Sequence, residues 1–148
     1  MSELLAPAGS IEAFYAAVNA GADAVYVGLS AFSARAYANN FSIPQLTELV
    51  KYAHLRNCLV FVTMNTIVFQ DELPVAFSLI DEIAKIPVDA LIIQDLGILK
   101  MNIPPIMLHA STQADVRDAD KVAFLEKKGF SRVVLARETP LELVNEIK

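Results

Sequence analysis

Residues 106–113, with the sequence IMLHASTQ, place a histidine and a serine two positions apart at the end of an apolar run. Residues i and i+2 of a β-strand point to the same face, so His109 and Ser111 are expected to lie side by side. An imidazole can act as a general base, and a hydroxyl can act as a nucleophile or as a hydrogen-bond donor. No Gly-x-Ser-x-Gly turn surrounds Ser111, and no aspartate is placed by the sequence to orient His109. The pair therefore indicates either a polar patch at the rim of a core or one wall of a pocket, with His109 as base or substrate contact and Ser111 chiefly as a donor.

Polar residues end other apolar runs in the same way. Asn65 closes LVFVTMN on the same face as Thr63, and Gln94 closes ALIIQ on the same face as Ile92. Ligand sites of barrels and of open α/β sheets lie at the carboxyl ends of the parallel strands. We therefore predict that these side chains gather in one pocket, where their amides bind substrate.

The loops after the runs add candidates with two readings each. Arg35 and Asn40, in the loop GLSAFSARAYANNF, are predicted to contact substrate, although Arg35 could equally cover the rim of the sheet. Arg137 and Glu138 follow the last run, where they either serve the site, Glu138 as a catalytic carboxylate, or pair with each other or cap the next helix. Asp95 is a candidate substrate contact and also a natural N-cap for the residues after it.

The positions of these candidate residues follow from the predicted strands and helices, because short β-branched runs alternate with amphipathic stretches along the chain. Strands are predicted at 3–6, 24–28, 59–65, 90–94, 106–110 and 132–136. Most are apolar throughout, which is typical of parallel strands covered on both faces. Helix starts are predicted at Ser10, Ser42, Asp71, Asp118 and Thr139, and helix ends at Gly21 and Gly129. Three segments, AGADAVYVG, IPVDALIIQD and KGFSRVVLARE, repeat the passage from a helix end through a turn into a strand.

This pattern predicts an α/β fold of about six (β/α) units in one domain, residues 1–148. A closed (β/α)₈ barrel needs eight units and about 250 residues. We therefore expect either an open sheet or, preferably, an incomplete TIM-barrel-like (β/α)₈ fold that is the N-terminal portion of a longer barrel. Uncovered strand edges would favour self-association into a homo-oligomer.

Composition narrows the function classes. Hydrophobic residues make up 55% of the 148 residues and the net charge is −5, so disorder is excluded and no long basic run announces nucleic-acid binding. Cys58 is the single cysteine, so this chain alone builds neither an internal disulfide nor a thiolate cluster, and we predict no metal site. The sequence has no signal-peptide pattern and no membrane-length apolar window. We expect a cytoplasmic protein without membrane partners.

Several strings occur in an order that resembles one known family. They are ELLAPAGSIEAFYAAVNAGADAVYVG, ARAYANNFS, VTMNTIV, DALIIQDLGIL, LHASTQ and RVVLARE. Together they resemble the collagenase-like peptidases of unassigned catalytic type, peptidase family U32, over essentially the whole chain. The resemblance implies a TIM-barrel-like catalytic domain and assigns motif positions at Arg35, Asn40, Asn65, Gln94, Asp95, His109, Ser111, Gln113, Arg137 and Glu138.

The resemblance implies more than one activity. Some members are regarded as peptidases; others act in oxygen-independent hydroxylation of tRNA or rRNA cytidine, or of a quinone precursor, with a four-cysteine iron–sulfur site downstream. The first hypothesis is a peptidase-like hydrolase in which Asn65, Gln94 and Gln113 bind peptide amides. The alternatives are a hydroxylation component acting on RNA or a quinone precursor, with its cluster in a longer form, and an inactive, associating partial barrel. One departure from the family pattern is STQADVRD, which lacks a histidine and an asparagine that usually follow the motif.

Overall fold

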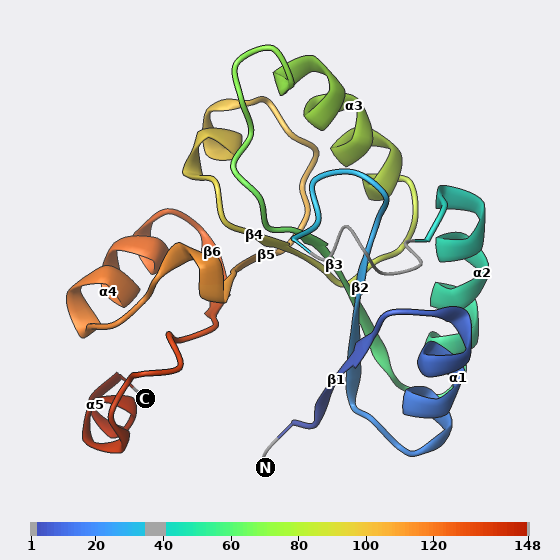
Figure 1. Cartoon of the computed structure of the whole chain (residues 1–148), viewed down its shortest axis with the longest axis horizontal. Coiled ribbons are helices and arrows are strands. Elements are labelled where there is room, and N and C mark those ends of the chain that lie inside the picture. The colour runs from blue at the N-terminus through green and yellow to red at the C-terminus, as the bar shows by residue number, and fades with distance from the viewer. Residues whose placement is uncertain (1–2, 35–40, 148) are drawn as a thin grey trace.

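The computed structural model describes residues 3–34 and 41–147. Within these ranges, strands and helices alternate along the chain (Figure 1). The strands are β1 (Leu5–Ala8), β2 (Ala24–Gly28), β3 (Leu59–Met64), β4 (Ala90–Ile93), β5 (Leu108–Ala110) and β6 (Phe130–Val133). The α-helices are α1 (Ile11–Asn19), α2 (Ile43–His54), α3 (Leu73–Ala84), α4 (Ala119–Lys127) and α5 (Leu141–Ile147), and the 3₁₀ helices are η1 (Leu96–Lys100) and η2 (Thr112–Ala114). In the part of the chain described, no helix has the length and apolarity needed to cross a membrane.

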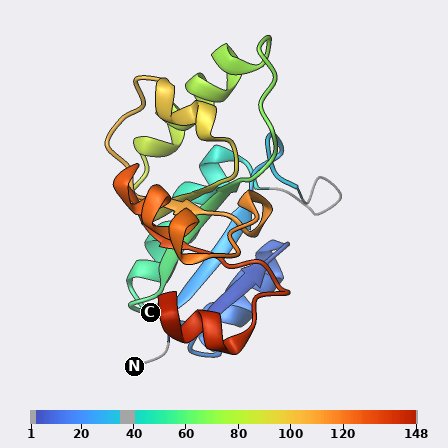
Figure 2. The same cartoon turned by 90° about the vertical axis from the view of Figure 1, so that its left-hand side faces the viewer.

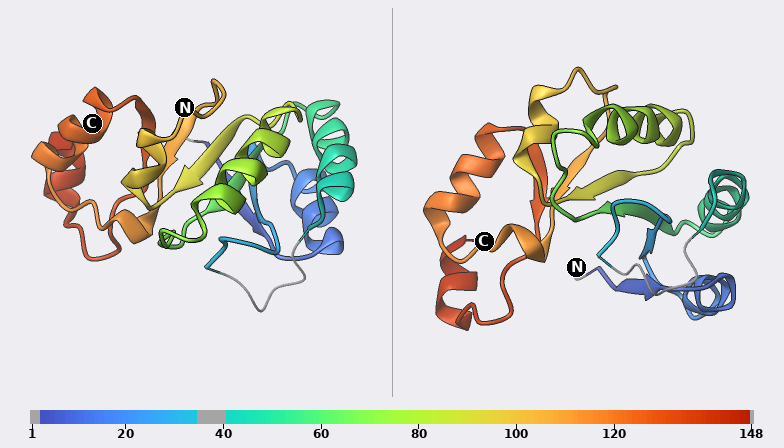
Figure 3. Two further views of the ribbon diagram at one scale, coloured as in Figure 1. Left: turned by 90° about the horizontal axis from the view of Figure 1, so that it is seen from above. Right: turned by 45° about the horizontal axis from the view of Figure 1, so that its top comes forward.

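The strands form one sheet in sequence order, β1-β2-β3-β4-β5-β6, and every neighbouring pair is parallel. Winding in one direction is the arrangement of a (β/α) barrel, whereas an open doubly wound sheet reverses its order at a switch point. The helices lie around the outside of the strands (Figure 3), and α3 and η1 stand together at one end of the molecule (Figures 1 and 2). The predicted α/β fold of about six barrel-like units is confirmed.

The two faces of the sheet have different cores. The helix-side face carries the larger cluster, to which β2, β3 and β4 contribute Val25, Val27, Val60, Val62, Met64, Leu91 and Ile93. The inner face carries a small cluster of Ala24, Phe61, Ala90 and Ile92, with Leu5 and Tyr26 against it. Leu108 and Ala110 join the helix-side core, whereas His109 packs on Phe61 of the inner cluster, as alternation of side chains along a strand requires.

Most helix starts follow the predicted capping chemistry. Ser10, Ser42 and Asp118 each accept a hydrogen bond from the backbone N–H three residues later, and Ser42 forms the predicted capping box with Gln45. The predicted start of α3 at Asp71 is wrong. The helix begins one residue later, after Glu72, whose carboxylate instead accepts from the N–H of Phe69 at 2.8 Å.

The first and last strands are displaced from the predicted ranges. β1 runs from Leu5 to Ala8 instead of 3–6, and β6 from Phe130 to Val133 instead of 132–136. A register irregularity between Leu108 and His109 accompanies the β5–β6 pairing, which sequence periodicity does not reveal. Thr139 does not cap α5, because its buried hydroxyl has no hydrogen-bond partner among the described residues.

The predicted repeat has a structural basis in two aspartates that precede strands. Asp23 accepts a hydrogen bond from the backbone N–H of Leu4 at 2.7 Å, and Asp89 accepts one from Val60 at 2.7 Å. Each carboxylate therefore ties the turn before its own strand to the start of the preceding strand. Asp89 also bonds the Nε2 atom of His54 at 2.9 Å, which anchors the end of α2 to the same turn.

Candidate functional site

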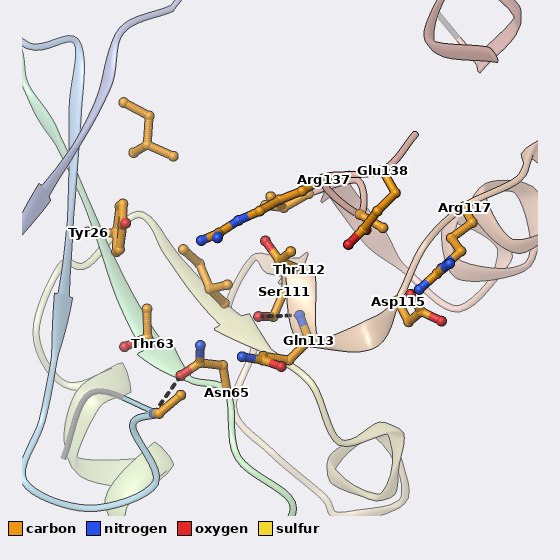
Figure 4. Close-up of a pocket in the computed structure, with 15 residues that line it drawn as sticks. Tyr26, Thr63, Asn65, Ser111, Thr112, Gln113, Asp115, Arg117, Arg137 and Glu138 are labelled. Carbon is orange, nitrogen blue, oxygen red and sulfur yellow. Dashed lines mark hydrogen bonds and ion pairs between the residues drawn. The ribbon is translucent and has the colours of Figure 1, made fainter. Parts of the chain in front are cut away.

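A cavity of about 560 Å³ lies at the carboxyl ends of the strands (Figure 4). All six strands, or the segments that directly follow them, contribute to its lining. Leu5, Tyr26 and Ile92 supply apolar surface, and polar side chains from the ends of β3, β5 and β6 supply the rest. Its volume falls within the range of ordinary small-molecule sites.

The cavity brings together half of the residues predicted for the site, namely Asn65, Ser111, Gln113, Arg137 and Glu138. Figure 4 shows Gln113 extending toward Asn65, and the Arg137 side chain reaching inward from the opposite wall. These residues come from positions as far apart as 65 and 138, so their convergence follows from the winding of the sheet.

The predicted residues Gln94, Asp95 and His109 are not among the residues that line the cavity. Gln94 follows β4 but is outside the cavity lining. Asp95 uses both carboxylate oxygens for backbone N–H groups, of Gly97 at 2.7 Å and of Val68 at 3.0 Å. It therefore fills the predicted N-cap position of η1 and ties the loop after β3 to that helix. Arg35 and Asn40 lie outside the described residues.

Hydrogen bonds fix the wall between β2 and β3. The hydroxyl of Thr63 donates to the carbonyl oxygen of Val27 at 3.1 Å, so the contact of 3.3 Å between Ser33 and Thr63 has Ser33 as its donor. One step further along, the backbone N–H of Ala34 donates to Oδ1 of Asn65 at 3.0 Å. The segment after β2 is thus joined to the end of β3 by side chains whose hydrogen bonds define their orientation.

Ser111 is buried, with 3% of its surface exposed, and acts as the N-cap of η2. Its Oγ accepts from the backbone N–H of Gln113 at 3.2 Å. In the described residues, no hydrogen bond joins Ser111 to an imidazole or a carboxylate, so the relay that activates a serine nucleophile is not assembled here.

His109 lies one layer beneath Ser111 on the inner face, paired with Ile92 of β4. It is 3% exposed, and its ring meets Phe61 edge-on at a centroid distance of 4.7 Å. The pKa of His109 is lowered to about 4, mainly by burial and then by the positive charge of Arg132, while the charge of Glu3 opposes both. The imidazole is therefore neutral near pH 7, with one nitrogen able to donate and the other able to accept.

Arg132 and Glu3 form the charged pair next to His109. The guanidinium of Arg132 donates to both carboxylate oxygens of Glu3, at 2.6 and 2.9 Å, and lies 5.4 Å from the centroid of Phe61. The hydrogen bond to Arg132 is the main reason why the pKa of Glu3 is lowered, and burial opposes it. This pair joins β6 to the residues before β1, across the side of the sheet where its two edges face each other.

The rim of the cavity carries charges that sequence reasoning missed. Arg117 donates to the carboxylate of Asp115 at 2.6 Å, and both residues line the cavity. Asp115 has a left-handed backbone with φ of 53°, which turns the chain after η2 back across the cavity. The sequence signal for this turn is faint, because aspartate is one of several residues that tolerate this conformation. Arg137 and Glu138 are both exposed, and no ion pair joins them in the described part of the chain.

The described residues offer few ligands for a metal ion or an iron–sulfur cluster. In residues 3–34 and 41–147, no group of three or more His, Cys, Asp or Glu side chains is arranged to hold a metal ion. Cys58 is buried just before β3, at the amino end of the sheet and thus away from the cavity. Burial, and then the charges of Asp23 and Asp89, raise the pKa of its thiol, which disfavours the thiolate that binds metals.

Residues 9–148 match the model of peptidase family U32. The chain is 48% identical over 145 residues to the 23S rRNA 5-hydroxycytidine C2501 synthase of Escherichia coli (strain K12), covering 98% of this chain and 22% of that protein. It is 39% identical to tRNA hydroxylation protein P of Helicobacter pylori (strain ATCC 700392 / 26695), covering 99% of this chain and 36% of that protein. It is 32% identical to a collagenase of Porphyromonas gingivalis (strain ATCC BAA-308 / W83), covering 98% of this chain and 35% of that protein.

A solved structure shows the same fold. The U32 peptidase Mk0906 matches with a TM-score of 0.75 at 18% identity, over 99% of this chain and 64% of that chain. The chain therefore spans between about a fifth and just over a third of the length of the curated relatives named above.

Proposed function

Because the chain belongs to peptidase family U32, in which RNA-hydroxylation proteins and a collagenase both match it, we propose that it supplies the nucleoside-binding part of an enzyme that hydroxylates cytidine in RNA. The observation that carries the proposal is 48% identity to a 23S rRNA 5-hydroxycytidine synthase, against 32% to the collagenase, at equal coverage of this chain. The hydroxylation alternative is thus better supported than the peptidase reading that led the sequence analysis. The proposal places the protein in the cytoplasm, where rRNA and tRNA are modified.

The shape of the cavity suits an extruded nucleoside. Enzymes that modify a base take it out of its stack and hold it in a closely fitting pocket between apolar or aromatic groups. Tyr26, Leu5 and Ile92 offer such surfaces, while polar groups lie at the strand ends around them. A volume of about 560 Å³ accommodates a nucleoside together with its nearest phosphate.

The rim supports binding to the RNA backbone. Arg137 lines the cavity and, in the described part of the chain, is not paired with a carboxylate, so its guanidinium is available to a phosphate oxygen. Arg117 lies at the same rim, but its charge is balanced by Asp115, so Arg137 is the arginine proposed to meet the phosphate. Arginine binds phosphate through several donors at once, and such contacts position a nucleic acid without reading its sequence. One unpaired arginine at the rim is compatible with a net charge of −5 for the whole chain.

The residues of this chain do not fit an iron–sulfur cluster. Four thiolates are the usual ligands, and the sequence has one cysteine, Cys58, which is buried with a raised pKa. Any cluster that serves the reaction takes its ligands from outside these 148 residues. The part assigned to this chain is to bind and orient the nucleoside. His109 is buried beneath the cavity, outside its lining, where its ring packs on Phe61.

A segment exchange tests the proposal. The matching 145 residues of the Escherichia coli synthase are replaced by this chain, and the chimera is expressed in a strain that lacks the synthase. We expect 5-hydroxycytidine at position 2501 of 23S rRNA, measured by mass spectrometry of nuclease digests. The intact synthase and an empty vector are the controls. A chimera that accumulates and melts like the intact synthase, yet leaves this cytidine unmodified, would refute the proposal.

Peptide hydrolysis is the second candidate, favoured by the similarity to the collagenase. It predicts cleavage of denatured collagen by the chain, with loss of cleavage in His109→Ala. If the wild-type chain leaves collagen and fluorescent casein intact under conditions where the chimera modifies RNA, the peptidase reading is refuted.

We also propose that the chain associates with itself through its sheet edges. β1 pairs with β2 and β6 pairs with β5, so in the described residues each of these strands has a paired neighbour on one side. Unpaired strand edges are templates for further pairing. Light scattering after gel filtration should give a mass above 16.2 kDa, and a strictly monomeric chain would refute this assignment.

A further inference from the structure

The amide of Asn65 has a fixed orientation. The backbone N–H of Ala34 can only donate, so the atom that faces it at 3.0 Å must be the oxygen Oδ1. The nitrogen Nδ2 then points the other way, into the cavity (Figure 4). Among the described residues Nδ2 has no acceptor, so this end of β3 presents a donor to whatever occupies the cavity.

Ser111 presents a second donor from the end of β5. Its Oγ accepts from the backbone N–H of Gln113 at 3.2 Å, and its own O–H is available as a donor. No acceptor for this hydroxyl is present in the described ranges. By contrast, the hydroxyl of Thr63, in the wall between β2 and β3, already donates to the carbonyl oxygen of Val27 at 3.1 Å.

A fixed amide donor beside a hydroxyl donor can distinguish the pyrimidines. Cytosine presents two adjacent acceptors, O2 and N3, on its Watson–Crick edge, whereas uracil presents O2 beside an N3–H donor. A donor that meets N3–H leaves both groups without a partner, and a buried unpaired polar group costs far more than a weakened hydrogen bond. Buried polar groups of this kind give strong discrimination between ligands of nearly equal shape.

We propose that Nδ2 of Asn65 and the hydroxyl of Ser111 read the O2–N3 edge of a cytosine base, which makes Asn65 the residue that selects cytosine over uracil. This inference rests on the proposed function and deepens it, because it assigns the base and the atoms that recognise it. The hydrogen bond from Ala34 is the positioning element, since without it the amide could turn over and present its oxygen instead.

Asn65→Asp tests the assignment with a minimal change. The carboxylate keeps an oxygen for the N–H of Ala34 and replaces the donor with an acceptor of the same shape. The matched control is Asn19→Asp, in which an oxygen likewise keeps its bond to the hydroxyl of Tyr52, 2.7 Å away at the end of α1. Both variants add one negative charge, and only the first does so in the cavity.

The probes are cytidine 5′-monophosphate and uridine 5′-monophosphate, titrated into the chain by calorimetry. The wild-type chain and Asn19→Asp should bind the cytidine probe about 10-fold more tightly than the uridine probe. In Asn65→Asp the preference should invert, with cytidine binding weakened about 30-fold, because an acceptor now meets N3–H of uracil favourably. Ser111→Ala should weaken cytidine binding about 10-fold without inversion. Thermal unfolding of each variant shows whether it is folded.

Equal binding of the two probes by the wild-type chain would overturn the assignment, as would binding of neither probe or a cytidine preference retained in a folded Asn65→Asp. The chimera experiment separates this failure from failure of the proposed function. If the chimera modifies position 2501 while one of these results holds, cytosine is read by other residues and the function stands. If the chimera is also inactive, both fail.

Discussion

The two ends of the same sheet use similar polar residues in opposite ways. At the amino end, the carboxylates of Asp23 and Asp89 are bonded to the backbone N–H groups of Leu4 and Val60. At the carboxyl end, Asn65 shares one atom with the backbone and leaves another facing the cavity. The first arrangement holds neighbouring strands in register, and the second leaves hydrogen-bonding capacity for a ligand.

The difference shows that burial and polarity alone do not identify a site. Asp95 lies at the carboxyl end, yet both of its oxygens accept from backbone N–H groups, so it resembles Asp89 more than it resembles Asn65. Structural residues such as Asp89 differ from Asn65 in the number of donors and acceptors that remain unused after their hydrogen bonds within the protein are made. This comparison predicts that variants at the amino end lose stability, and that variants at the cavity lose binding.

The largest expected effect on stability comes from protonation of His109, which is buried in the sheet between these two ends. The pKa of His109 is lowered from 6.5 to about 4 in the folded chain, so the unfolded chain takes up the proton first as the pH falls. Stability is therefore fully present above about pH 6.5 and is lost progressively toward pH 4, by about 2 to 3 kcal/mol. Urea unfolding at several pH values measures this loss.

The control is His109→Gln, which should remove that part of the pH dependence while the contribution of the neighbouring Glu3 remains. Identical pH profiles for the wild-type chain and the variant would contradict the lowered pKa.

At the amino end, Asp89→Ala should lower the free energy of unfolding by about 2 kcal/mol. It leaves the buried N–H of Val60 without an acceptor and also removes the partner of His54. The loss is measured by urea unfolding at pH 7. Asp89→Asn keeps a carbonyl oxygen for Val60 and should recover most of the stability, and equal losses in both variants would show that the hydrogen bond is not the cause.

Ser111→Ala should affect both stability and binding, because Ser111 caps η2 and also faces the cavity. Loss of the cap should lower the unfolding free energy by about 1 kcal/mol, less than Asp89→Ala does. Thermal unfolding measures this change, with Ser111→Thr as a variant that can keep the cap. A loss as large as that of Asp89→Ala would place Ser111 with the structural aspartates.

Arg137→Gln should have the smallest effect on stability, within about 0.5 kcal/mol, because the side chain is exposed. Its effect should be on RNA instead. The affinity for a single-stranded RNA should fall, and the slope of log affinity against log salt should decrease by about one. Arg56→Gln, which removes an arginine held over the ring of Tyr52 on α2, is the matched control and should leave the slope unchanged.

Much of the fold could be predicted because its signals are local. β2 was predicted with its exact bounds, since Gly21 and Asp23 mark the turn before it and Gly28 ends it. Alternation along β5 puts His109 on the inner face and Leu108 on the helix side of the sheet. Local signals failed for α3 and α5, where the predicted caps Asp71 and Thr139 are not used.

The site was predicted in part for the same reason. Strand parity indicated Asn65 and Ser111, which line the cavity. The pairing of Glu3 with Arg132 joins residues 129 positions apart, so no local pattern could indicate it. Arg117 enters the cavity through the left-handed turn at Asp115, a backbone conformation that the sequence does not specify.

The strict sequence order of the strands has a consequence for how the chain folds during synthesis. Each strand from β2 onward is hydrogen-bonded to the strand that precedes it in the sequence. During synthesis, a new strand therefore finds its partner already translated. Each β–α segment can dock as soon as it leaves the ribosome, which keeps apolar surface covered while translation proceeds. The ion pair between Glu3 and Arg132 can form only after β6 has been synthesised and has joined the sheet. Its formation therefore follows the docking of the earlier β–α segments.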